Sequence, residues 1–243
     1  VPVVASALAA GGALAAPTVR LCMPDIELPP YSHRAASEPG LLDRLLQDAS
    51  RAAGLKLSIE RMPSARCRQA LLQGDMDAMP LPAIPAYMAE MDFPMQQGRL
   101  DRSARLLRLP VVLLRRRGEA QTWDGQRLSP PGLKVGTRLG LTTLADRLLA
   151  LGAELDDKAF TNEQLLGKLL AGRIDLVAMS QPEFEALQSS RARASQLEAL
   201  PIPLLEMELY LAFSRRLQHV PAERLQAWRE QLKRLRESPA YQP

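Results

Sequence analysis

Apolar residues follow two spacings along the chain, and their succession predicts strands that alternate with helices. Compact apolar runs at residues 18–23, 55–61 and 77–81 are typical of short buried strands. Apolar residues recur at helical spacing over residues 41–53, and a second helix is expected over residues 64–72. Because helices separate the strands, we expect a parallel sheet with helices packed on its faces.

The second half of the chain repeats this succession. Strands are predicted at residues 133–137, 156–160 and 174–179. Capping-box patterns that begin at Thr143 and Thr161 are each expected to open a helix between two of these strands. The sequence therefore predicts a second α/β unit.

Two long extended runs connect the units. Residues 106–117 form an apolar run that leaves the first unit, and residues 206–214 form a run that returns to it. We therefore expect lobe 1 to comprise residues 17–109 and 212–243, and lobe 2 to comprise residues 110–211.

The composition narrows the class of protein. Hydrophobic residues make up 47% of the 243 residues and charged residues 24%, which is ordinary for a globular chain with a sizeable core. Aromatic residues make up only 4%, so aliphatic side chains must fill that core. The net charge of +4 arises from scattered arginines rather than from a basic stripe interleaved with aromatics, which argues against nucleic-acid binding.

The first sixteen residues differ from the rest of the chain. They are uncharged, apolar and rich in small side chains, and Ala13-Leu14-Ala15 forms an A-x-A pattern that signal peptidase can cleave. We interpret residues 1–16 as part of a cleaved signal peptide and predict export to the periplasm. No later segment is apolar enough to predict a membrane-spanning helix.

A series of short motifs, taken in order, resembles one protein family. The motifs are Pro29-Pro30-Tyr31-Ser32, Gly74-x-x-Asp77, Phe93-Pro94, Gly140-x-Thr142, Gly172-x-x-Asp175 and Tyr210-x-Ala212-Phe213-Ser214. Over nearly the whole chain they resemble the bacterial extracellular solute-binding proteins of family 3, which are related to the polar amino-acid receptors of ABC importers.

The resemblance implies a type II periplasmic-binding fold, in which two α/β lobes are joined by two hinge crossovers and enclose the ligand. It also implies a monomeric receptor that captures a small polar molecule for an inner-membrane ABC permease, without catalysis and without a cofactor. Two alternatives stay open: a periplasmic sensor subunit, and a dehydratase-like enzyme in which Glu183 or Glu206 would act as acid or base.

Two charged anchors of the amino-acid receptors have no counterpart in this chain. The receptors bind the ligand α-carboxylate with an arginine after the third strand, but no arginine lies between Arg68 and Arg99. They bind the ammonium group with an aspartate that would fall near Ser180, and residues 176–187 contain no aspartate. Because a bidentate arginine clamp is lost only at a large cost, we do not expect a standard α-amino acid as ligand.

Eight residues at predicted strand ends and helix starts are candidates to line the ligand site. Aromatic and hydroxyl side chains can stack on a ligand or hydrogen-bond to it, and Arg66 could replace the missing anion contact. If Arg66 faces solvent instead, a neutral or cationic ligand is favoured. The two histidines, His33 and His219, match no metal-ligand spacing, so no metal site is expected. The candidates are Tyr31, Ser32, Arg66, Tyr87, Thr142, Thr143, Ser180 and Gln181.

The two cysteines are placed to form a disulfide. Cys22 lies at the carboxyl end of the first predicted strand, and Cys67 lies near the start of the helix after the second strand. Neighbouring parallel strands bring both residues to one edge of the sheet, and export permits oxidation. We therefore predict a Cys22–Cys67 disulfide, with two buried free thiols as the alternative.

Overall fold

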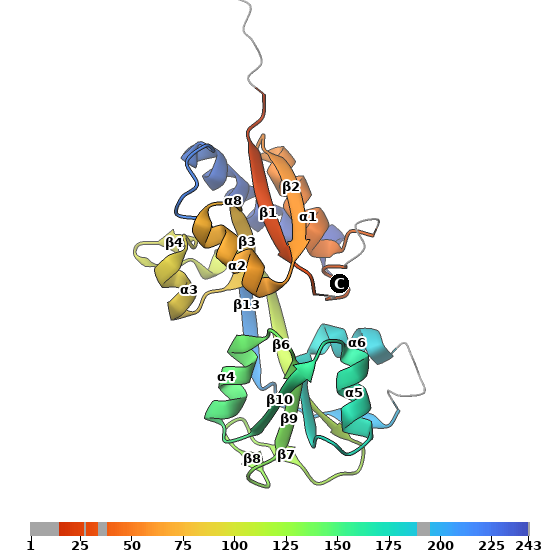
Figure 1. The fold of residues 1–243 in the computed structure, drawn as a ribbon. Coiled ribbons are helices and arrows are strands. Elements are labelled where there is room, and N and C mark those ends of the chain that lie inside the picture. The colour runs from red at the N-terminus through yellow and green to blue at the C-terminus, as the bar shows by residue number, and fades with distance from the viewer. Residues whose placement is uncertain (1–14, 27, 34–37, 189–194, 243) are drawn as a thin grey trace, which may run out of the picture.

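The computed structural model describes residues 15–26, 28–33, 38–188 and 195–242, so almost all of the predicted signal peptide lies outside the described residues. Two α/β lobes are stacked one above the other, and two strands run between them (Figure 1). The predicted two-lobed α/β fold is therefore confirmed. Among the described residues, no helix combines the length and the apolar character that a membrane crossing requires.

Lobe 1 contains a small parallel sheet with helices on both faces. Its elements are β1 (Thr18–Pro24), α1 (Leu41–Ala52), β2 (Lys56–Met62), α2 (Ser64–Gln73), β3 (Ala78–Pro82), α3 (Pro85–Glu90), β4 (Met95–Gln96), β5 (Arg99–Leu100), η1 (Arg102–Ala104), α8 (Ala222–Arg236) and η2 (Pro239–Tyr241). Strand β1 lies between β2 and β3 and is parallel to both, as the strand–helix succession predicted. The short helix α3 and the β4–β5 hairpin carry no clear apolar pattern and were not expected.

Lobe 2 repeats this arrangement around β9. Its elements are β7 (Thr122–Trp123), β8 (Leu128–Ser129), β9 (Lys134–Arg138), α4 (Thr142–Ala150), β10 (Glu154–Ala159), α5 (Asn162–Leu170), β11 (Leu176–Ser180), α6 (Gln181–Gln188) and β12 (Leu197–Ala199). Strand β9 is parallel to β10 on one side and to β11 on the other. The carboxyl ends of β9 and β11 therefore lie at the same edge of the sheet, where α4 and α6 begin.

The antiparallel strands β6 (Arg105–Arg116) and β13 (Leu205–Phe213) connect the lobes. In lobe 1, β13 pairs with β3 over residues 209–213, and in lobe 2, β6 pairs with β11 over residues 111–114. Between these stretches the two strands pair with each other, with Met207 opposite Leu109. The lobe boundaries expected at 109/110 and 211/212 both fall within these two connecting strands and stay a prediction.

Successive side chains of each strand point to opposite faces, and helices cover both faces. In β1, Leu21 packs with α1 and α8, while Cys22 packs on the other face with α2. In β6, Leu113 packs with α4, while Leu114 packs with α5 and α6. Each lobe therefore has two apolar layers, one on each side of its sheet, which hold it together as a separate body.

One of the two predicted helix caps is confirmed. The Thr161 side chain caps α5 by accepting a hydrogen bond from the backbone N–H of Gln164. Thr143 lies inside the first turn of α4, whose N-cap is Leu141 without a side-chain cap. The cap predicted at Thr143 is wrong because the chain enters the helix two residues earlier than the sequence pattern indicates.

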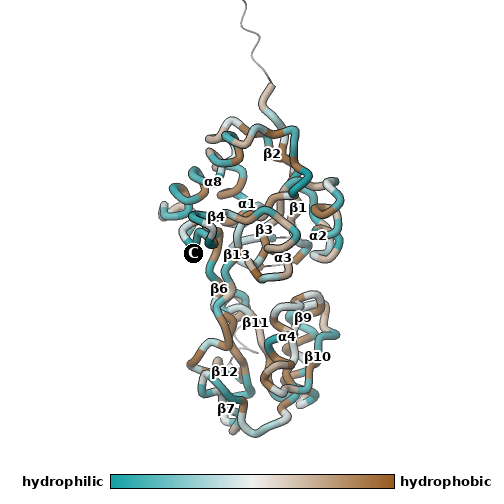
Figure 2. Tube along the Cα trace, turned by 90° about the vertical axis from the view of Figure 1, so that its left-hand side faces the viewer, coloured by the Kyte–Doolittle hydropathy of each residue, from teal (hydrophilic) through white to brown (hydrophobic). Residues whose placement is uncertain are grey.

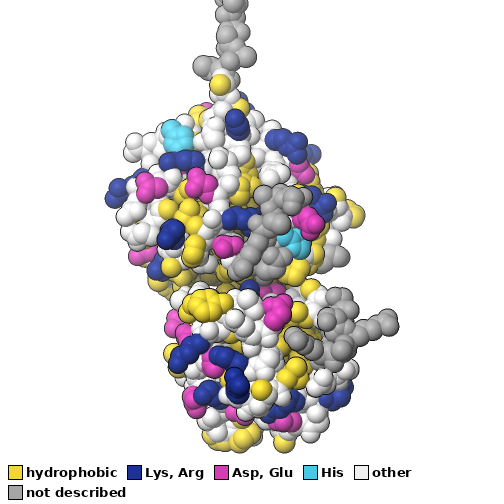
Figure 3. Space-filling model, turned by 45° about the vertical axis from the view of Figure 1, so that its right-hand side comes forward, with side chains coloured by type: hydrophobic (Ala, Val, Ile, Leu, Met, Phe, Trp, Pro, Cys, Tyr) yellow, Lys and Arg dark blue, Asp and Glu magenta, His cyan; other side chains and the backbone are white. Residues whose placement is uncertain are grey.

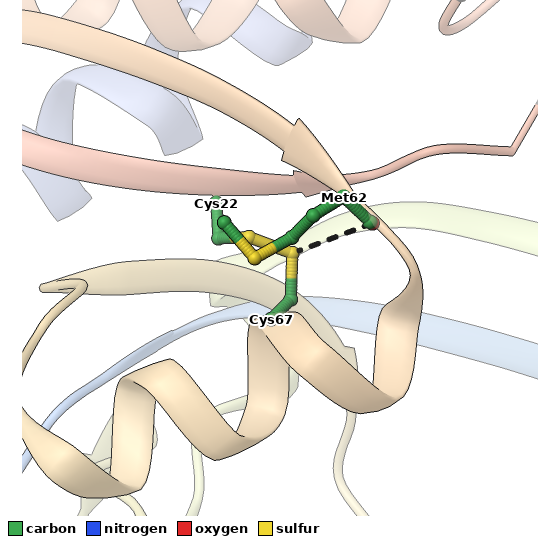
Figure 4. The surroundings of a disulfide bond; sticks show 3 residues. All are labelled: Cys22, Met62 and Cys67. Atoms are coloured by element: carbon green, nitrogen blue, oxygen red, sulfur yellow. Dashed lines mark hydrogen bonds between the residues drawn. A yellow bond between two sulfur atoms is a disulfide. The ribbon is translucent and has the colours of Figure 1, made fainter.

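Cys22 and Cys67 form the predicted disulfide, which ties β1 to the first turns of α2 (Figure 4). Their Cα atoms are 5.6 Å apart, within the usual range for such a bridge. Both side chains are fully buried and pack with Leu71 and Met79. The bridge therefore holds α2 against the sheet of lobe 1.

We predict that removing the disulfide destabilises lobe 1. The sequence separation of 45 residues corresponds to about 4 kcal/mol in the chain-entropy account of cross-linking. The Cys22→Ala/Cys67→Ala variant should therefore unfold at a lower urea concentration than the wild type, as followed by circular dichroism. Reduction should lower the wild-type midpoint similarly and leave the variant unchanged; a wild-type midpoint insensitive to reduction would contradict the prediction.

Candidate functional site

A cavity lies between the two lobes, and the connecting strands β6 and β13 form part of its wall. Its volume is about 170 Å³, many times the roughly 10–15 Å³ that one water molecule needs. The space-filling view shows the junction at which the two lobes meet, with charges of both signs scattered around it (Figure 3). The cavity can therefore admit a small molecule and place it in contact with both lobes.

The lobe 1 wall is largely apolar and offers few backbone donors. The carboxyl ends of β1 and β3 and the segment after β1 form it. Pro24, Pro80 and Pro82 all line the cavity, and proline has no backbone N–H to offer a ligand. Ser32 and Ser64 add hydroxyl groups to this wall.

The lobe 2 wall combines the end of β9, the start of α4 and the end of β11. A helix start carries N–H groups and partial positive charge, so the first turn of α4 suits an oxygen atom of a ligand. The structure thus brings five of the eight candidate residues to one cavity. They are Ser32, Tyr87, Thr142, Thr143 and Ser180.

A buried ion pair between Arg138 and Glu183 lies in the lobe 2 wall. The two residues are 7% and 3% exposed. Glu183 also accepts hydrogen bonds from Asn162 Nδ2 (3.3 Å), from the backbone N–H of Ser180 (3.2 Å) and from the Ser180 hydroxyl (2.6 Å). Protein groups therefore hold both carboxylate oxygens, and the charge of Arg138 is balanced within lobe 2.

The sequence alone does not indicate this ion pair. Glu183 was expected only as a possible acid or base, and no role was predicted for Arg138. The pattern Ser180-x-x-Glu183, with Pro182 between them, is typical of a helix start where the glutamate reaches back to the cap. That signal could have placed Glu183 at the cleft edge, but nothing around Arg138 distinguishes it from an ordinary charge at a strand end.

A second charge pair holds Ser32 in the lobe 1 wall. Arg61 Nη2 donates to Asp43 Oδ1 (2.8 Å), and Arg61 Nη1 donates to the Ser32 hydroxyl (3.0 Å). The approach of α1 to this loop requires Gly40, because a Cβ there would lie 2.2 Å from the carbonyl oxygen of Tyr31. The Ser32 hydroxyl is therefore fixed in position before any ligand arrives.

Tyr87 and Thr142 meet across the cavity. The Tyr87 hydroxyl lies 3.5 Å from Thr142 Oγ1, and their helices, α3 and α4, face each other across the junction (Figure 2). The guanidinium carbon of Arg68 lies 5.3 Å from the centre of the Tyr87 ring, a favourable cation–π arrangement. A hydrogen bond of this length is weak, so the contact contributes little to holding the two lobes together.

The other three candidates lie outside the cavity lining. Tyr31 is buried in the core of lobe 1, where burial and, to a smaller extent, the negative charge of Glu185 raise the pKa of its hydroxyl. Arg66 is exposed to solvent on α2, and Gln181 is exposed and donates a hydrogen bond to Glu185 (2.7 Å). Because Arg66 faces solvent, it does not supply the missing anion contact. A neutral or cationic ligand is then favoured, as stated above for this case.

We predict that Glu183→Gln destabilises lobe 2 by about 3 kcal/mol, because removing one member of a buried ion pair leaves the other charge without its partner. Chemical denaturation of the variant and the wild type measures this change. Glu185→Gln is the matched control, since Glu185 is exposed on the same helix, and it should change stability by no more than about 0.5 kcal/mol. Equal stabilities of the two variants would refute the structural role of the pair.

Comparisons with known proteins show the fold. No protein-family model and no curated protein matches the chain. Solved structures match it over nearly its full length at low identity. A histidine kinase sensor domain with similarity to periplasmic binding proteins has a TM-score of 0.70 at 18% identity, covering 93% of this chain and 93% of that chain.

Two ligand-binding proteins match similarly. The GluR0 ligand-binding core from Nostoc punctiforme, in complex with L-glutamate, has a TM-score of 0.69 at 15% identity, covering 92% of this chain and 95% of that chain. An ancestral amino acid-binding protein, a precursor of cyclohexadienyl dehydratase, has a TM-score of 0.68 at 17% identity, covering 92% of each chain. The chain therefore has the two-lobed fold of the periplasmic binding proteins, as the sequence resemblance implied.

Proposed function

We propose that this chain is a periplasmic solute-binding protein that closes around a small molecule and delivers it, as a monomer, to an ABC importer of the inner membrane. The observation that carries the proposal is the cavity lined by both lobes and by both connecting strands. A ligand that touches both walls has a higher affinity for the closed arrangement than for an open one, so it shifts the population towards closure.

The disulfide supports the location of the protein in this proposal. Bridges of this kind form and persist in oxidising compartments such as the periplasm, and are rare in the cytosol. The apolar segment with its A-x-A pattern at residues 1–16 agrees with export.

The cavity favours binding over catalysis. No histidine, lysine or cysteine stands among its described lining residues, and Glu183 is the carboxylate that they include. Three neighbouring residues hold both oxygens of Glu183, which leaves it poorly placed to exchange a proton with a ligand. Glu206, the other acid or base considered, pairs with Arg108 and is outside the cavity lining.

A periplasmic sensor subunit is the second candidate function, favoured by the full-length fold match to a histidine kinase sensor domain. Binding and closure are the same in both roles, and the partner that recognises the closed form differs. Stimulation of the ATPase activity of an importer complex by the ligand-bound protein would support delivery rather than sensing.

We predict that a thermal-shift screen of small metabolites finds saturable stabilisation without chemical change of the compound. A ligand present at 100 times its dissociation constant stabilises a protein by about 2.7 kcal/mol, which such a screen detects readily. Conversion of the stabilising compound to a product would favour the enzyme alternative. A broad screen without a saturable shift would overturn the solute-binding proposal.

A pair of variants on α4 locates the binding event. Thr143→Trp places an indole ring on the cavity wall and should abolish the stabilisation by any compound found in the screen. Arg147→Trp introduces the same ring on the exposed side of the helix and should leave the stabilisation unchanged. Loss of binding in both variants, or in neither, would place the ligand elsewhere.

A further inference from the structure

We propose that the ligand of this cavity is an uncharged, ring-sized molecule with a mostly apolar surface and one or two oxygen atoms. This inference rests on the proposed solute-binding function and names its ligand class. It departs from the small polar solute that the sequence resemblance implies.

The described part of the cavity lining carries one cation and one anion, Arg138 and Glu183, and they pair with each other. A charged group of a ligand buried here would need an opposite charge from the protein to replace its hydration. Either member of the pair could offer that charge only by giving up the other. An uncharged ligand requires no such exchange.

The surroundings of the pair resist this exchange. Asn162 and Ser180 direct three further hydrogen bonds at the carboxylate of Glu183, so a ligand ammonium group would face several donors already in place. Arg138 ends β9 and Glu183 lies in the first turn of α6, so both belong to lobe 2. Opening or closing of the cleft therefore leaves the pair intact.

The charge pair behind Ser32 is likewise internal to lobe 1. Ser32 lines the cavity, and the charges that stand behind it are those of Arg61 and Asp43, which bind each other at 2.8 Å. The Ser32 hydroxyl already accepts a hydrogen bond from Arg61, so it offers a ligand a neutral oxygen rather than a charge. Both walls thus present hydroxyl groups where a zwitterion would need ions.

Size and shape point to a single ring. The connecting strands contribute Leu109, Val111, Met207 and Leu209 to the wall, all of them apolar. The volume of about 170 Å³ is close to that of an apolar cavity of about 150 Å³ that binds benzene. The hydroxyl groups near the start of α4 suit the oxygen atom of such a ligand.

A matched series of ring compounds tests the proposal. Benzamide and benzyl alcohol are neutral, benzoate is an anion, benzylamine is a cation, and L-phenylalanine is a zwitterion. Titration calorimetry of the full chain with each, up to about 10 mM, detects even millimolar affinities. We expect a neutral member to bind at least about tenfold more tightly than every charged member.

The Glu183→Gln variant adds a second measurement. Without its carboxylate partner, Arg138 should receive an anion, so the affinity for benzoate should rise by about tenfold while that for benzamide changes little. Glu185→Gln should change neither affinity. A wild type that prefers benzoate or phenylalanine would overturn the ligand class and leave the solute-binding function standing. Absence of binding by the whole series would also overturn this class, and the broader metabolite screen decides the function separately.

Discussion

The hydrogen-bonded ribbon of β6 and β13 is the constraint on which the rest of the molecule depends. Through this ribbon, hydrogen-bonded strands follow one another without a break from β10 in lobe 2 to β2 in lobe 1. Each lobe nevertheless packs its own apolar layers on its own part of this sheet. Pro110, which has no backbone N–H, lies in this ribbon opposite Glu206. Two separately packed bodies joined by this ribbon line the cavity between them.

Charged side chains in the walls of this cleft pair with each other within one lobe. Arg138 with Glu183 in lobe 2, and Arg61 with Asp43 in lobe 1, neutralise each other within one wall and are largely withdrawn from water. Such pairs fix the position of Ser180 and Ser32, whose hydroxyls remain at the cavity. The charges that a receptor for zwitterions would direct at its ligand are here directed at the protein itself, and they serve to keep the walls in shape.

Much of the fold follows from the sequence, because the spacing of apolar residues and the helix-ending glycines are local signals. The short helix α3 and the two hairpins escaped prediction since their residues carry no such periodicity. Within the site, Ser32 and Tyr31 are neighbours in sequence, yet Ser32 lines the cavity and the Tyr31 ring packs into the core. The direction of a side chain in a loop depends on contacts with distant residues such as Gly40 and Arg61, which no local pattern reveals. The same holds for the pairing of Arg138 with Glu183.

The strong contacts at this site lie within each lobe, and the Tyr87–Thr142 contact between the lobes is weak. The disulfide and the Arg61–Asp43 pair hold the lobe 1 wall in place, and the buried Arg138–Glu183 pair does the same for lobe 2. Across the cleft, the Tyr87–Thr142 contact at 3.5 Å is at the outer limit of a hydrogen bond and contributes little. A contact that weak neither locks the closed form nor prevents opening. In the solute-binding role that we propose, the free energy that favours closure then comes mainly from the proposed ligand, whose apolar surface leaves water only when both walls enclose it.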